Sequence, residues 1–150
     1  MLLRTHLAFA VLIILLFISH VNNSWVFILM VLIGTILPDL DTRFSSWGRH
    51  LIFRPLQFFV KHRGIIHSLT TAIITSVLLA MFWPVVSLGF FVGYSVHIIL
   101  DSFTREGVQP FWPLKARSYG FISSGGRIED SIFVFLIIVD VFLIILAFAF

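Results

Sequence analysis

The sequence contains no cysteine, and only 11% of its 150 residues are charged. The absence of cysteine excludes disulfide bonds, thiolate metal ligands and cysteine nucleophiles. A soluble domain carries about 25% charged residues because its surface faces water. With 59% hydrophobic residues, this chain cannot cover a water-facing surface of its own. We therefore expect a single integral-membrane domain over residues 1–150.

Apolar segments predict an all-α bundle of about five membrane helices, since one span needs about 20 mostly apolar residues. The second segment has a short apolar core, so we expect it to bend near Gly34 or to end below the interface. The first has Arg4 before an apolar stretch, as a signal peptide does, but no A-x-A-like cleavage site follows it. The segments cover roughly residues 2 or 7 to 19, 24–37, 65–82, 84–100 and 132–150.

The cations are distributed unevenly over the connections between these segments. All ten Lys and Arg residues fall outside the predicted spans, at ends that the number of crossings places on one face. The connections at residues 19–24 and at Trp83-Pro84 have none. The positive-inside rule places the cationic face in the cytoplasm. It predicts a cytoplasmic N-terminus and, with five spans, an external C-terminus.

Two longer connections belong to the cationic face. Residues 42–61 mix aromatic and basic side chains, which is typical of an amphipathic helix lying in the membrane interface, although a plain connecting loop fits them as well. Residues 102–130 are polar and contain several glycines and prolines. They predict a structured loop.

Histidine and aspartate residues recur at the span ends on the cationic face. Ionisable groups at this depth are costly without partners. Because the four span ends share one face, we expect their side chains to converge at one depth. They are the start of the first span (His6), the end of the second (Asp39, Asp41), the start of the third (His62, His67) and the end of the fourth (His97, Asp101).

Local spacing sharpens this expectation. His97 and Asp101 are four residues apart, so they share one helical face, and Gly93 on the same stripe would allow a neighbouring helix to approach closely. His62 and His67 could approach one centre if a turn separates them. Each residue also has a structural interpretation: an interface hydrogen bond for His6, helix caps for the two aspartates of the second span, and a hydrogen-bonded pair for His97 and Asp101.

Mixed imidazole and carboxylate ligands suit Zn²⁺ best, and also Mn²⁺ or Fe. With more than four ligands available, one or two ions are predicted, and such sites chiefly hydrolyse phosphoesters. Asp41 is a candidate ligand or base, and Arg63 or Arg105 a candidate phosphate-binding group. The predicted metal ligands are His6, Asp39, His62, His67, His97 and Asp101.

Other ionisable residues carry weaker signals. Asp140 lies in the middle of the last span, where it is expected to be protonated or paired. Glu129 is an acid–base candidate by proximity alone, as are Glu106 and Asp130. His20 belongs to the opposite face and His50 to the amphipathic segment. Ser68 and Thr104 flank the cluster, where ligand orientation and helix capping explain them equally well.

The ordered set of motifs resembles the YdjM-type membrane-bound metal-dependent hydrolases, described in bacteria as LexA-binding and inner-membrane-associated. It is also distantly similar to zinc-dependent phospholipase C. The resemblance covers about residues 1–115 and implies a helical bundle, a divalent metal and hydrolysis. The matching motifs are Thr5-His6, Leu37-Pro38-Asp39-Leu40-Asp41, His62-Arg63-Gly64 with His67-Ser68, Gly93 through His97 to Asp101, and Thr104, Gly107 and Phe111-Trp112-Pro113.

The sequence therefore predicts a metal-dependent hydrolase of the inner membrane, acting at the cytoplasmic face on a phosphoester of a lipid or lipid-linked substrate. A water-soluble phosphoester from the cytoplasm fits the same depth. The alternatives are a transporter or ion pathway that uses the same side chains, and a non-catalytic membrane scaffold. Few polar residues continue through the first four spans, which disfavours transport. Membrane lipid is the expected partner and nucleic acid is not.

Overall fold

The computed structural model describes residues 1–41 and 64–149, and over these residues the protein is helical. Helices dominate, as the apolar segments predict, and the all-α class is confirmed. Two 3₁₀ turns, η1 (Ile18–His20) and η2 (Leu37–Asp41), follow the first two helices. The helices are α1 (Leu3–Phe17), α2 (Ser24–Ile36), α4 (Leu69–Phe82), α5 (Pro84–Ser102) and α6 (Arg127–Ala149).

Three of these segments are long and apolar enough to cross a membrane: Leu3–His20, α5 and α6. Ser24–Leu40 and α4 are shorter. The α-helical geometry of α2 stops at Ile36, two residues before Pro38, which has no N–H to continue the hydrogen-bond ladder. This agrees with the expected short second span. The predicted amphipathic segment, residues 42–61, lies outside the described residues.

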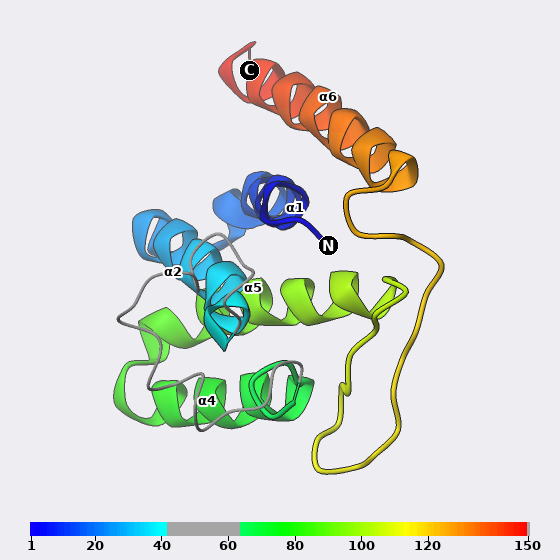
Figure 1. Cartoon of the computed structure of the whole chain (residues 1–150). Helices are drawn as coiled ribbons and strands as arrows, with labels where there is room; N and C mark the ends of the chain where they lie inside the picture. The colour runs from blue at the N-terminus through cyan, green and yellow to red at the C-terminus, as the bar shows by residue number, and fades with distance from the viewer. Residues whose placement is uncertain (42–63, 150) are drawn as a thin grey trace.

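Helix α5 lies at the centre of the bundle and contacts α1, α2 and α4. Helix α6 packs against α1, and Figure 1 shows it on the side of α1 that faces away from α4. It begins at Arg127 rather than near residue 132, because the polar first turn is helical too. Acidic side chains in that turn, Glu129 and Asp130, suit the positive end of the helix dipole.

Helices α2 and α5 approach each other closely at three glycines, Gly34, Gly89 and Gly93. A Cβ on Gly93 would lie 2.1 Å from the carbonyl oxygen of Val31, and one on Gly34 would lie 2.5 Å from that of Phe90. The expected close approach at Gly93 is therefore present. Thr35 links the two backbones, because its hydroxyl donates to Val31 at 2.8 Å and to Gly93 at 3.3 Å. This contact sets the register of α5, and with it the position of His97, one turn further on.

The two ends of the bundle differ in charge. Residues 20–23 and the start of α5, including Pro84 and Leu88, line one shallow pocket, so the two uncharged connections share one end. The opposite end holds the start of α1, the end of α5 and the start of α6, where Arg4 pairs with Asp130. The cations of the described chain all belong to this end: Arg4, Arg105, Lys115, Arg117 and Arg127. The predicted sorting of the cations to one end is correct for these residues.

The loop between α5 and α6 is structured, as predicted. Isolated bridges pair Thr104 with Ile122 and Val108 with Ser118. The N–H of Leu69 at the start of α4 donates to the carbonyl of Pro110 at 2.8 Å. The loop is thereby tied to the end of the bundle that carries the charged residues.

Candidate metal centre

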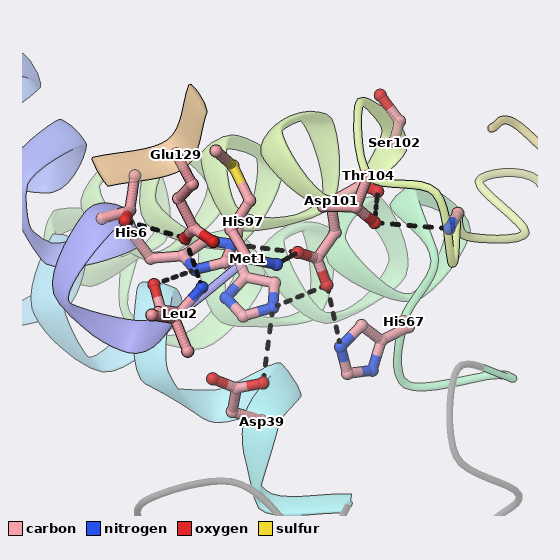
Figure 2. Close-up of polar contacts among 12 residues, drawn as sticks. Met1, Leu2, His6, Asp39, His67, His97, Asp101, Ser102, Thr104 and Glu129 are labelled. Carbon is pink, nitrogen blue, oxygen red and sulfur yellow. Dashed lines mark hydrogen bonds and ion pairs between the residues drawn. The ribbon is translucent and has the colours of Figure 1, made fainter. Parts of the chain in front are cut away.

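Five histidine and aspartate side chains converge at the cationic end of the bundle (Figure 2). His6 comes from the first turn of α1, Asp39 from η2, and His67 from the turn before α4, while His97 and Asp101 come from the last turns of α5. His6, Asp39 and His67 lie near the ends of three different predicted spans. His97 and Asp101 lie near the end of a fourth span, on one face of α5. The predicted convergence is thus present for the five residues whose side chains are described.

Asp101 lies between the three imidazoles. Its Oδ1 is 3.3 Å from Nε2 of His6, and its Oδ2 is 3.8 Å from Nε2 of both His67 and His97. Nε2 of His97 is also 3.9 Å from Oδ1 of Asp39. The rings of His6 and His97 stack with centroids 4.1 Å apart, and the ring of His67 stands edge-on to His97 at 5.3 Å. Three imidazoles and two carboxylates therefore face one small volume.

Four of the five cluster side chains are buried, and the fifth is partly exposed. His6, His67 and His97 are 0% exposed and Asp101 is 2% exposed. The side chain of Asp39 is 15% exposed. In the described part of the chain, the open side of the cluster is therefore the side of Asp39.

Two of the imidazoles have a fixed tautomer. Nδ1 of His6 is 3.1 Å from the carbonyl oxygen of Leu2, and Nδ1 of His97 is 2.7 Å from that of Thr35. Because a carbonyl accepts, each Nδ1 must donate, and in the neutral imidazole this leaves Nε2 with a lone pair. Both Nε2 atoms are buried and make no hydrogen bond to any residue that the structure describes. A lone pair that faces a carboxylate is stable when a cation lies between them.

The start of α6 fixes the start of α1. Glu129 is fully buried, and its carboxylate accepts from the N–H of Leu2 at 2.5 Å, the hydroxyl of Thr5 at 2.8 Å and the N–H of Gly125 at 2.6 Å. The Leu2 residue that it holds also supplies the carbonyl that orients His6. From the sequence, Glu129 is a candidate acid or base by proximity alone. Its contacts show that it holds the turn that carries His6.

The amino group of Met1 also contacts Oδ1 of Asp101 (Figure 2). The carboxylate thus has a cationic neighbour as well as three imidazoles. An ion bound through Oδ1 would take the place of this contact.

The remaining predicted site residues fall into two groups. His62 and Arg63 lie outside the described residues, as does the side chain of Asp41, whose backbone ends η2. Arg105 is exposed at the cationic end, where its Nε donates to the carbonyl of Phe121 at 3.4 Å. Its guanidinium contacts none of the five cluster residues through any described hydrogen bond or ion pair.

The flanking residues have structural roles. Ser68 caps α4, since its hydroxyl oxygen accepts from the N–H of Thr71 at 3.2 Å. Thr104 donates to the backbone carbonyl of Asp101 at 2.7 Å and closes the end of α5. His20 is exposed at the uncharged end, as expected. Asp140 is 4% exposed in α6, and its Oδ1 has no hydrogen-bond partner within residues 1–41 and 64–149.

The spacing of the donor atoms fits a divalent ion. Two groups have ligand atoms that all lie within 4.8 Å of one another: His6 with His97 and Asp101, and Asp39 with His67 and His97. In a tetrahedral zinc site with bonds of about 2.0–2.1 Å, neighbouring ligand atoms are about 3.3–3.4 Å apart. The separations between imidazole nitrogens and carboxylate oxygens are 3.3–3.9 Å, and a bound ion would draw these atoms closer together.

The fold and the cluster define a class: a helical membrane protein with a buried cluster of imidazole and carboxylate side chains at one end of its bundle. Comparison with protein families matches residues 1–149 to the YdjM inner membrane protein family, and the chain belongs to this family. The resemblance seen in the motifs is thereby confirmed. The family name and the apolar helices identify an inner membrane protein.

Two curated relatives have the same name. Inner membrane protein YdjM of Escherichia coli (strain K12) is 32% identical over 108 residues, which cover 64% of this chain and 54% of that protein. Inner membrane protein YdjM of Shigella flexneri matches with the same figures. The chain thus aligns with about half the length of these relatives. No solved structure matches.

Proposed function

We propose that this protein is a metal-dependent hydrolase of the inner membrane, acting on a phosphoester of a lipid or lipid-linked substrate at the cytoplasmic face. The observation that carries the proposal is the buried cluster of His6, His67, His97, Asp101 and Asp39. Burying this many ionisable groups is costly unless they pair with one another or bind a metal.

The tautomers of His6 and His97 support a metal in preference to a network of hydrogen bonds. In each residue Nδ1 donates to a backbone carbonyl, as metal-ligating histidines commonly do. In the neutral imidazoles the Nε2 lone pairs face carboxylates, and two acceptors repel one another unless a cation lies between them. Zn²⁺ is the best match to this donor set, and Mn²⁺ or Fe also accept it.

The described residues favour one ion. Both candidate ligand groups include His97, and its Nδ1 is bonded to Thr35, so only Nε2 remains for an ion. A second ion would need ligands from outside the described residues, and His62 is the predicted candidate. Metal stoichiometry therefore tests whether His62 joins the centre.

The arrangement also supports a direction of approach for the substrate. A divalent ion bound here would supply Lewis acidity and an activated water, the usual means of phosphoester hydrolysis at metal sites. The deeply buried histidines and Asp101 would hold the ion, while Asp39 would bind it at the open side. A substrate phosphate would approach past Asp39, where Arg63 or Arg105 would bind its charge and Asp41 would act as base.

The depth of the cluster supports a substrate at the membrane surface. The ligands lie at helix ends next to the cationic residues, and the positive-inside rule assigns such an end to the cytoplasm. Because the chain lacks cysteine, single cysteines test this orientation without background. We expect a membrane-impermeant thiol reagent to label Asn22→Cys in intact cells or spheroplasts and Ser124→Cys only in inverted vesicles. The reverse pattern would place the site outside.

The central experiment is elemental analysis of the purified protein and three variants. His67→Ala and His97→Ala remove predicted ligands, and His20→Ala removes the exposed histidine of the opposite end as a matched control. We expect bound zinc, manganese or iron in the wild type and in His20→Ala, and loss of metal in the other two. Full stoichiometry in both ligand variants would overturn the assignment.

Metal-loaded protein is then screened with phosphatase and phospholipase substrates. Turnover that disappears on chelation and in His97→Ala supports hydrolysis. Metal-dependent uptake into proteoliposomes without turnover would instead support an ion pathway. A metal-free protein whose thermal stability does not change in His97→Ala would support a scaffold.

A further inference from the structure

The loop between α5 and α6 exposes large apolar side chains at the cationic end of the bundle. Phe103 is 50% exposed, Trp112 39% and Phe121 68%, and three others are similarly open. We call residues 103–121 the aromatic loop. Its exposed apolar side chains are Phe103, Phe111, Trp112, Leu114, Tyr119 and Phe121.

These side chains are held outward by a fixed backbone. Thr104 and Val108 are buried and pair with Ile122 and Ser118, and Pro110 accepts from the N–H of Leu69. The apolar residues therefore do not fold back onto the bundle. An apolar surface of this kind on an anchored loop usually marks an interaction site.

The position of the loop indicates what covers it. It follows the last turn of α5 and precedes α6, and both helices are long and apolar enough to cross the membrane. Figure 1 shows the loop running across the ends of α4 and α5 rather than along them. A segment that lies across the ends of membrane helices lies at the depth of the lipid head groups. Tryptophan and tyrosine are enriched at this depth.

The opposite end has aromatic residues of the same kind. Trp25 is 86% exposed and Trp83 is 65% exposed, and both lie at the uncharged connections. Exposed tryptophans at both ends of the bundle are typical of the two aromatic belts of a membrane protein. The aromatic loop differs from the other belt because it also carries cations.

The charge of the loop selects the kind of lipid. Arg105, Lys115 and Arg117 are exposed, and Glu106 is the one acidic residue among residues 103–121. Cations interleaved with aromatic side chains complement an anionic lipid surface, where the aromatic rings enter the interface and the cations bind phosphates.

We propose that the aromatic loop lies within the head-group layer of the leaflet at the cluster's end and binds anionic phospholipid head groups there. The assignment does not depend on the metal centre, because it rests on the loop alone. The aromatic loop would concentrate lipid phosphate groups at the cationic end of the bundle.

The first test uses Trp112 as a depth reporter. Trp25, Trp47 and Trp83 are replaced by Phe, and the full chain is reconstituted in phosphatidylcholine vesicles with and without phosphatidylglycerol. We expect blue-shifted emission from Trp112, quenched more strongly by a spin label near the head group than by one deep in the acyl chains. Emission quenched by aqueous acrylamide as fully as free tryptophan, with no effect of lipid labels, would overturn the proposal and favour a soluble protein partner.

The second test addresses lipid selectivity. Electron spin resonance compares the binding of spin-labelled phosphatidylglycerol and phosphatidylcholine to the wild type and to Lys115→Gln/Arg117→Gln. We expect the preference for phosphatidylglycerol to fall by about twofold or more in the variant and with added salt. The charge-conserving control, Lys115→Arg/Arg117→Lys, should keep the preference. Equal selectivity in all three proteins would show that Lys115 and Arg117 do not select anionic lipid, and would overturn that part of the proposal.

Discussion

Helices α5 and α6 both have the length and composition of membrane spans, but they serve the molecule differently. Half of the apolar stretch of α5 is buried inside the protein, against 11% of the apolar stretch of α6. Helix α5 carries Gly93, His97 and Asp101 on faces that contact other helices. Most of α6 faces outward, and its contribution near the cluster comes through Glu129 in its first turn.

The composition of an apolar segment indicates two things: whether it can lie in lipid, and where it contacts other parts of the protein. Uniform apolarity shows that a segment can lie in lipid, and α6 is the more uniform of the two. Departures from apolarity show where a segment meets protein, because a glycine admits a neighbouring backbone and an ionisable group needs a partner. Substitutions in the two helices should therefore have very different effects.

The largest effect is expected at Gly93. A Cβ there would overlap the carbonyl of Val31, which is backbone and cannot rotate away, so Gly93→Val should separate α2 from α5. We expect destabilisation of about 3 kcal/mol or more, with loss of bound metal, because Thr35 and His97 lie on the two separated helices. Thermal unfolding in detergent measures the change.

The matched control for Gly93→Val is Ala147→Val, which adds a branched side chain at an exposed position of α6. It should leave the unfolding temperature nearly unchanged. If Gly93→Val unfolds at the wild-type temperature, the close contact between α2 and α5 is not what holds α5 in place.

A smaller effect is expected at Glu129, where α6 reaches the centre. Glu129→Gln replaces one of the two accepting carboxylate oxygens by an NH2 group, so the oxygen that remains can accept from Leu2 and Thr5 or from Gly125, but not from all three. The carbonyl that orients His6 belongs to Leu2, so the metal affinity should fall about 10–100-fold. A competition titration with a chromophoric zinc chelator measures it.

The neighbouring acid provides the control for Glu129. Asp130 pairs with Arg4 at the surface, and exposed ion pairs contribute about 0–1 kcal/mol. Asp130→Asn should therefore retain the wild-type affinity. Equal affinities in Glu129→Gln and Asp130→Asn would show that α6 contributes lipid contact alone.

Much of the fold and of the cluster could be predicted because the membrane restricts the topology. Apolar runs determined the spans, and counting the crossings placed His6, His67 and Asp101 at one end although they are far apart in the sequence. The glycine at position 93 indicated a helix contact because few other residues admit a backbone so closely. These predictions use residue types whose physical constraints are strong.

The parts of the site that could not be predicted depend on backbone carbonyls and on contacts between residues that are far apart in the sequence. The carbonyls of Leu2 and Thr35 orient two imidazoles, but every residue has a carbonyl. The role of Glu129 depends on contacts with residues more than a hundred positions away, and a search for apolar runs starts α6 after its polar first turn. The acidic residues of that turn are a signal that could have placed the helix start correctly.

The smallest effect is expected at Asp140, which tests whether the rest of α6 is a lipid anchor. Asp140 and Leu136 are buried on one face of α6, and α1 is the helix that packs there. Because Oδ1 of Asp140 has no hydrogen-bond partner among the described residues, Asp140→Leu should stabilise the protein by about 1–2 kcal/mol, and Asp140→Asn should be nearly neutral. Neither should change metal content or turnover, because α6 meets the cluster through Glu129. If Asp140→Asn instead abolished turnover, or if the wild type showed a proton flux in vesicles that the variant lacked, the interior of α6 would belong to the function, and an ion pathway would explain a carboxyl group buried in a helix that is otherwise apolar.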